Sequence, residues 1–189
     1  FHSFNDVTSL PRPTQKPRPP FYLAAVGTPD SFERAGRLGH GLMAIPGVGH
    51  NPTELIQIYR KAWKDAGHPG RGSIMMAVFM YCHESQAQAE RIAKGPIERH
   101  FASIYDAMSE HVRMAPSADY KGYDKMAEKV RQETFETQVQ HNAAFVGTPD
   151  RIVQQLRAYD EEIGGCDHIS MQVNFNDMPY DVAERSVRL

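Results

Sequence analysis

Strand-like runs that alternate with stretches of helical periodicity are the strongest constraint on how this 189-residue chain can fold. The runs are residues 21–26, 41–46, 74–82 and 167–175, and helical spacing follows each of them. Parallel strands need a helical crossover between them, so strict alternation predicts an α/β fold with a parallel sheet. Four such units make either a small open sheet or half of an eight-stranded barrel.

The sequence Gly-Thr-Pro-Asp-Ser at 27–31 joins the first run, which we expect to be a strand buried on both faces, to its helix. Thr28 is favoured as the N-cap, and the proline and aspartate after it suit the first helical turn. Gly39 is placed to end that helix. Backbone N–H groups and the hydroxyls of Thr28 and Ser31 therefore meet at one point that can hold a phosphate. The alternative is an ordinary capped turn without a ligand. Taken by itself, the sequence of this turn favours that alternative, because glycine-rich phosphate-binding motifs are absent.

The sequence Val-Gly-Thr-Pro-Asp occurs twice, at 26–30 and again at 146–150. The second copy also begins a helical pattern, but only a short run, His-Asn-Ala-Ala-Phe, precedes it. The phosphate interpretation is therefore weaker there, and we expect Thr148 to be a structural N-cap.

The segments between these units are expected to be loops or helices. Residues 1–20 hold five prolines between 11 and 20 and predict an extended surface crossover, with a proline-rich ligand segment as the alternative. Residues 111–124 lose periodicity and predict a loop excursion. Helices are expected over 85–94, 96–110 and 125–140. The chain begins without Met and stops inside a helical pattern, so we expect a piece of a longer protein.

Composition argues against several classes of function. The net charge is −2, and no basic tract suggests a nucleic-acid partner. No apolar run is long enough to span a membrane, and no segment resembles a secretory signal. Cys82 and Cys166 are expected to be free, buried thiols in a reducing cytoplasm. The nine histidines form no metal-binding motif, so we expect no metal site.

Four motifs in this order and spacing resemble the bacterial luciferase-like monooxygenases. They are the proline-rich segment 11–20, the sequence Phe-Tyr-Leu-Ala-Ala-Val-Gly-Thr-Pro-Asp-Ser at 21–31, Ala-Gly-Arg-Leu-Gly-His-Gly at 35–41, and Val-Gly-Thr-Pro-Asp-Arg-Ile at 146–152. The resemblance implies a (β/α)₈ TIM-barrel type of fold. Residues 1–189 would be the C-terminal part of this single barrel domain, supplying roughly strands five to eight with their helices.

The resemblance also implies a place for the cofactor. In that family the loop after strand five holds the flavin phosphate, and the matching positions here are Ala25, Val26, Gly27, Thr28 and Ser31. The helix N-terminus and the two hydroxyls give the same position a physical basis. Gly27 departs from bacterial luciferase, which carries an acidic residue there, so a contact made by that side chain is missing.

Residues at the carboxyl ends of the strands are the candidates to line a substrate pocket. They are Ile45, Phe79, Tyr81, Gln172 and Asn174, although packing of the barrel core would explain any one of them equally well. Alkanesulfonate-cleaving relatives carry Arg and His where this chain has Ala77 and Phe79, which favours an apolar substrate. We name no catalytic residue, because the residues associated with chemistry belong to the family's first half.

The resemblance implies a flavin-dependent monooxygenase that uses reduced FMN and O₂ to oxidise a small organic substrate. A flavin reductase would supply the reduced flavin, and the protein would form a homo- or heterodimer. Two alternatives stay open: an F420-dependent oxidoreductase on the same scaffold, and a non-catalytic flavin-binding half-barrel.

Overall fold

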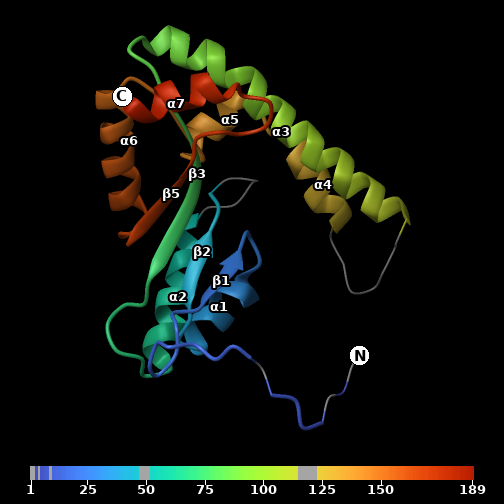
Figure 1. The fold of residues 1–189 in the computed structure, drawn as a ribbon, viewed down its shortest axis with the longest axis vertical. Coiled ribbons are helices and arrows are strands. Elements are labelled where there is room, and N and C mark those ends of the chain that lie inside the picture. The colour runs from blue at the N-terminus through green and yellow to red at the C-terminus, as the bar shows by residue number, and fades with distance from the viewer. Residues whose placement is uncertain (1–2, 4, 9, 47–51, 115–122) are drawn as a thin grey trace.

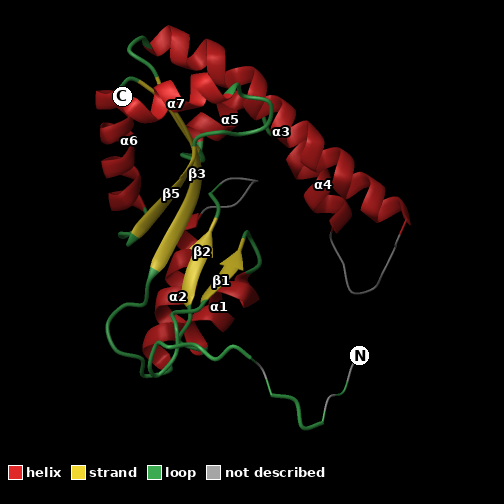
Figure 2. Ribbon diagram, viewed as in Figure 1, coloured by secondary structure: helices red, strands yellow, loops and turns green. Residues whose placement is uncertain are grey.

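The computed structural model describes residues 3, 5–8, 10–46, 52–114 and 123–189, which form a parallel sheet with helices packed around it (Figures 1 and 2). The strands in these residues are β1 (Tyr22–Ala25), β2 (Gly41–Ala44), β3 (Ile74–Cys82), β4 (Ala144–Gly147) and β5 (His168–Gln172). The helices are α1 (Pro29–Arg37), α2 (Pro52–Asp65), α3 (Gln86–Met114), α4 (Tyr123–Arg131), α5 (Phe135–Gln140), α6 (Pro149–Glu162) and α7 (Tyr180–Arg188).

Strand β3 is the centre of the sheet. Strand β2 pairs with the first residues of β3 along one edge and with β1 along its other edge. Strand β5 pairs with Met75–Phe79 and lies on the opposite side of β3 from β2 (Figure 1). Strand β4 pairs with the last four residues of β3, Phe79–Cys82. Every pairing is parallel, so the predicted α/β fold with a parallel sheet is confirmed.

The strands differ from the prediction in number and in burial. The short run before the second Val-Gly-Thr-Pro-Asp forms a fifth strand, β4, where we expected none. The first strand is not buried on both faces, and within the described residues β1 lies at an edge of the sheet, where it pairs only with β2. Phe21 is 51% exposed, and of the β1 residues only Ala25 is buried.

Tertiary contacts also change the predicted helices. One helix, α3, runs through Pro96 where two helices were expected, because Ala89, Ala93 and Ile97 pack one face of it into the core. The expected helix 125–140 is instead two helices, α4 and α5, separated by a capping box in which Thr134 and Thr137 bond each other's backbone N–H. The predicted loop 111–124 begins within α3, and its residues 115–122 lie outside the described residues.

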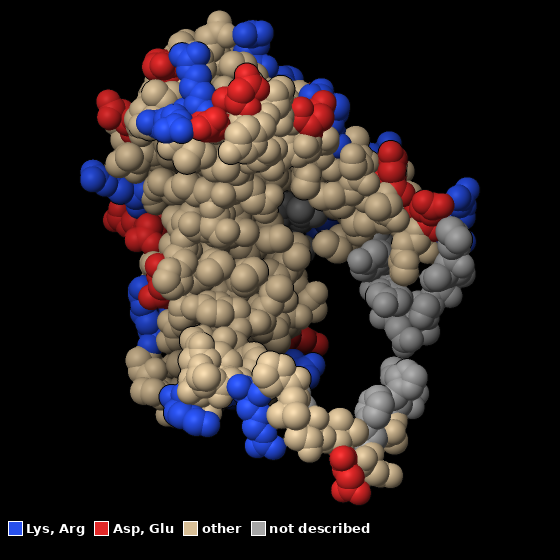
Figure 3. Space-filling view, in the orientation of Figure 1, with Lys and Arg blue, Asp and Glu red and all other residues tan. Residues whose placement is uncertain are grey.

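Two apolar cores cover opposite faces of the sheet. Even-numbered β3 residues, such as Met76 and Val78, pack with α1, α2 and α6. Phe79 and Tyr81 point the other way and pack with α3 and residues around α7. The amino-terminal half of that second face has no helix in front of it in Figure 2, and Figure 3 shows no charged side chain over its centre. The helices α3, α4 and α5 share the second core with Phe79 and Tyr81, in the carboxyl-terminal half of β3, and with β4.

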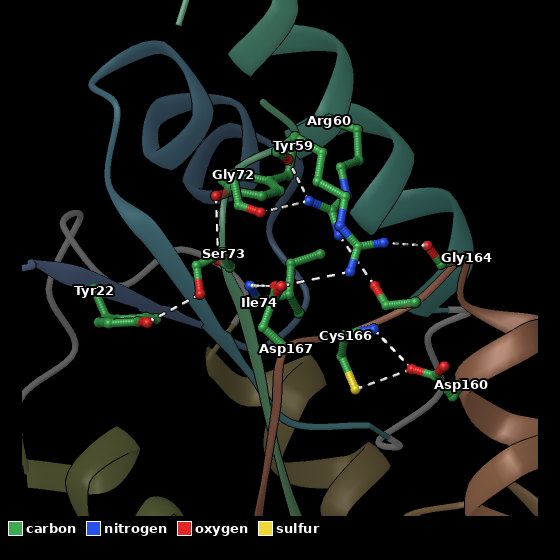
Figure 4. Close-up of polar contacts among 12 residues, drawn as sticks. Tyr22, Tyr59, Arg60, Gly72, Ser73, Ile74, Asp160, Gly164, Cys166 and Asp167 are labelled. Atoms are coloured by element: carbon green, nitrogen blue, oxygen red, sulfur yellow. Dashed lines mark hydrogen bonds and ion pairs between the residues drawn. The ribbon is translucent and has the colours of Figure 1, made fainter. Parts of the chain in front are cut away.

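A hydrogen-bonded cluster fixes the amino end of the sheet (Figure 4). Arg60 of α2 donates to the carbonyl oxygens of Arg71, Gly72 and Gly165, on the segments that lead into β3 and β5. The Asp167 carboxylate accepts the Ile74 N–H at 2.8 Å. These bonds hold β3 and β5 in register at their amino ends, and this register also fixes where their carboxyl ends lie.

Candidate functional site

A cavity of about 170 Å³ lies where the strands end, which is the edge at which parallel α/β folds bind ligands. Its floor comes from the residues after β1 and β2, the middle of β3 and the last residue of β5. Its walls come from α3, α4 and α5. Strand β3 continues past this level, which is why its middle, and not its end, faces the cavity.

The structure brings four of the predicted site residues together in this cavity. Ile45, Phe79 and Gln172, expected to line a substrate pocket, are joined by Val26 from the expected cofactor loop. Tyr81 shares the face of Phe79 but lies two residues farther along β3, beside Val146 of β4, and is 2% exposed. Asn174 lies beyond the end of β5 and is exposed. Neither Tyr81 nor Asn174 lines the cavity within the described residues.

His100 of α3 is a cavity residue that the sequence did not reveal. With Ile104 and Met108 it forms a stripe at a spacing of four residues along the helix wall. Its ring meets the ring of Phe79 edge to face, with centroids 5.0 Å apart. Burial lowers the pKa of His100 below its ordinary value of 6.5, which favours the neutral imidazole. The spacing to Ile104 was the available signal, because it places His100 on the apolar face of the predicted helix.

Gln138 supplies a second polar group, and its position is fixed. Its side chain is 1% exposed, and its amide donates to the Glu133 carboxylate at 2.7 Å. The capping box of α5 also holds Glu133, which accepts from the Thr137 hydroxyl at 2.7 Å. The remaining polar lining residue among those described, Gln172, is exposed.

The predicted phosphate turn is an uncapped helix start. Thr28 has the extended backbone of an N-cap residue, but its side chain makes no capping hydrogen bond to α1. The Ser31 N–H bonds the Thr28 carbonyl at 2.9 Å, which closes the turn through the backbone alone. The Thr28 side chain is exposed and Ser31 is half-buried. The turn thus leaves the Thr28 hydroxyl available to a ligand, directly after Val26 and Gly27.

Other features of the described residues supply no competing site. A hollow of about 290 Å³ between α1 and α2 is open and bordered by charged side chains of both signs, such as Glu33 and Lys61. No group of three or more His, Cys, Asp or Glu side chains in the described part of the chain could hold a metal ion. Both cysteines are free, and burial raises the pKa of Cys166 to about 11. No helix in the described ranges has the length and apolar character needed to cross a membrane.

Solved structures with this fold include monooxygenases and an F420-dependent dehydrogenase. Monooxygenase RslO1 from Streptomyces bottropensis is 28% identical, with a TM-score of 0.68 over 100% of this chain and 51% of its own. The oxygenating constituent of 3,6-diketocamphane monooxygenase from Pseudomonas putida, solved with FMN, is 21% identical. Its TM-score is 0.60, over 85% of this chain and 43% of its own. An F420-dependent secondary alcohol dehydrogenase is 16% identical, with a TM-score of 0.52 over 82% of this chain and 43% of its own.

The chain spans about half the length of these solved proteins. No curated protein matches it. Residues 1–165, by contrast, match the family described as luciferase-like monooxygenase, which is most of the chain. The resemblance inferred from the four sequence motifs is therefore confirmed, and the chain belongs to the luciferase-like monooxygenase family.

Proposed function

We propose that this chain is part of a flavin-dependent monooxygenase that uses reduced FMN and O₂ to oxidise a small, largely apolar organic compound. The observation that carries the proposal is the family match over residues 1–165. The mainly apolar cavity at the carboxyl ends of the strands supports it, because ligands bind at that edge in parallel barrels. In this proposal the chain supplies roughly strands five to eight of a (β/α)₈ barrel.

The turn at 27–31 fits the phosphate of FMN. The Thr28 hydroxyl is not used as a cap, Ser31 lies one turn on, and the N-terminus of α1 carries a partial positive charge. The Asp30 carboxylate in the same turn opposes a second anion, so hydroxyls and backbone N–H groups, and not net positive charge, would hold the phosphate. Ala25, Val26 and Gly27 would bring the chain to that group.

When bound, reduced FMN supplies the electrons that activate O₂. The chain's own residues would bind and orient the flavin and the substrate, and they would exclude water from the cavity. Phe79, Ile104 and Met108 make the cavity apolar and keep water from an organic substrate held there. The fixed Gln138 amide and the fixed amino end of the sheet keep the walls in place. A separate reductase would deliver the reduced flavin.

The test compares FMN with riboflavin, which lacks the phosphate, on the full-length protein and its Thr28→Ala/Ser31→Ala variant. Each charge-assisted hydrogen bond contributes ~1.5–3 kcal/mol, so FMN binding should weaken by about 2–5 kcal/mol while riboflavin binding hardly changes. Thr148→Ala is the matched control, because it alters the same sequence at the other copy. Equal losses for both ligands, or no loss, would show that the turn does not hold the phosphate.

An F420-dependent oxidoreductase is the second candidate function, because a dehydrogenase with that cofactor shares the fold. At 16% identity this likeness concerns the fold alone, whereas the 28% identical structure is a monooxygenase. Reconstituting the full-length protein with each reduced cofactor separates the two. Substrate-dependent O₂ consumption with reduced FMN is expected, and oxygen-independent turnover with F420 alone would overturn the first proposal.

A further inference from the structure

His100 is the one ionisable side chain among the described residues that line the cavity. Around it the lining is almost entirely apolar, with Phe79 and Phe101 against the imidazole ring. The Phe101 ring stands at 90° to it, with centroids 5.6 Å apart. Two aromatic edges thus fix the plane of the imidazole, while its neighbours on the helix wall, Ile104 and Met108, offer no polar group.

The ring nitrogens of His100 make no hydrogen bond to any described residue. His68 and His83 differ from His100 in this respect, whereas the buried Nδ1 of His40 also has no hydrogen-bond partner. The His68 ring bonds the Arg37 carbonyl at 3.0 Å, and the His83 ring accepts the Ser85 N–H at 3.0 Å. A half-buried imidazole without a protein partner can satisfy its nitrogens only with solvent or with a molecule in the cavity.

We propose that His100 recognises the substrate by a hydrogen bond between a ring nitrogen and the single carbonyl or hydroxyl oxygen of an otherwise apolar compound. A neutral imidazole offers one donor and one acceptor, so it suits either oxygen. Such a bond discriminates between compounds, because a compound without the oxygen gives the imidazole no partner within the cavity. The inference extends the proposed function, since it names the substrate class of the same cavity.

The competing role for His100 is packing alone, as a flat ring between two phenylalanines. Packing depends on the shape of the ring and not on its nitrogens. The two roles therefore differ in what a pair of equally shaped ligands should show: only a hydrogen bond distinguishes a ligand with an oxygen from one without it.

The probes are cyclohexanone and cyclohexanol, each with one oxygen, and methylenecyclohexane, which has the planar carbon of cyclohexanone with a CH₂ group in place of its oxygen. Their binding to the full-length protein is measured by NMR titration without flavin. We expect whichever of cyclohexanone and cyclohexanol binds more tightly to bind about fivefold more tightly than methylenecyclohexane. His100→Phe should abolish that preference by weakening the oxygen probe alone, and His100→Gln, which keeps hydrogen-bonding groups, should retain part of it.

Ile104→Val is the matched control from the same stripe of α3, and it should change the three affinities by a similar factor. A measurement on the unchanged protein covers the case in which His100→Phe does not fold. The ring nitrogen resonances of His100 should shift with an oxygen probe and stay in place with methylenecyclohexane.

Three results would overturn the inference: no preference in the unchanged protein, an undiminished preference in His100→Phe, or an equal loss for all three probes. Because these titrations contain no flavin, they are independent of the flavin proposal. If FMN fails to bind while the preference follows His100, the cofactor assignment is wrong and the recognition role stands. If FMN binds as proposed but the preference is absent, only the role of His100 is lost.

Discussion

The two copies of Val-Gly-Thr-Pro-Asp begin helices α1 and α6 with the same five residues but in different surroundings. In the second copy the Thr148 hydroxyl accepts the Arg151 N–H at 3.4 Å, so the side chain caps its own helix. In the first copy the Thr28 side chain makes no such bond. A shared local sequence therefore sets where each helix starts, but it does not set what the threonine hydroxyl does.

The surroundings explain the difference. Val146 and Gly147 are inside strand β4, paired with the end of β3, and Val146 is 1% exposed. Val26 lies past the end of β1 and faces the cavity. One copy is thus built into a closed part of the sheet, and the other stands at the open edge where a ligand can reach it. Three variants measure how deep that difference goes.

Gly147→Ala should give the largest loss of stability. A Cβ atom there would lie 2.4 Å from Gln86 Oε1 and 3.0 Å from Arg151 Cγ. Gln86 cannot move freely, because its amide donates to Glu90 at 2.6 Å and to the Val146 carbonyl at 3.3 Å. Overpacking of this kind costs about 1–3 kcal/mol of unfolding free energy, measured by urea denaturation of the full-length protein.

Gln86→Ala provides the control for that variant, since it removes the obstructing oxygen. In a double-mutant cycle, Gly147→Ala should destabilise the Gln86→Ala background by less than it destabilises the original protein. An equal effect in both backgrounds would mean that the crowding at Gly147 is not the cause.

Thr148→Ala should have an intermediate effect. Loss of an N-cap hydroxyl costs about 1 kcal/mol, and Thr148→Ser should restore most of it because serine also caps. Denaturation curves of the three proteins measure this. Affinity for FMN should not change. If flavin binding falls with Thr148→Ala instead, the phosphate has been assigned to the wrong copy.

The strongly patterned parts of the fold could be predicted from the sequence. The apolar run 74–82 and the Thr-Pro-Asp helix starts depend on local pattern, and each appears where it was expected. The burial of β1 could not be predicted, because an edge strand and a central strand can share the same residues. The passage of α3 through Pro96 depends on packing against the sheet, which outweighs the helix-breaking tendency of proline.

Only the part of the candidate site that lies at the strand ends could be predicted from the sequence. Ile45, Phe79 and Gln172, which line the cavity, could be named as candidates because the carboxyl ends of parallel strands meet at one edge. His100 and Gln138 come from helices that fold over this edge, and the sequence does not state which helix face will meet it. A residue's role in the cavity thus depends on long-range placement that local periodicity does not contain.

Thr28→Ala should have the smallest effect on stability, and it tests the comparison most directly. No side-chain capping bond is lost, and the turn is already closed by the Ser31 N–H bonding the Thr28 carbonyl at 2.9 Å. The unfolding free energy should therefore change by less than about 0.5 kcal/mol, as for an ordinary surface substitution. Under the proposed function the same variant weakens FMN binding, so affinity and stability should separate at Thr28, whereas at Thr148 stability alone should respond. If Thr28→Ala destabilises the protein as much as Thr148→Ala does, the first copy is a structural cap like the second, and the case for a ligand at this turn fails.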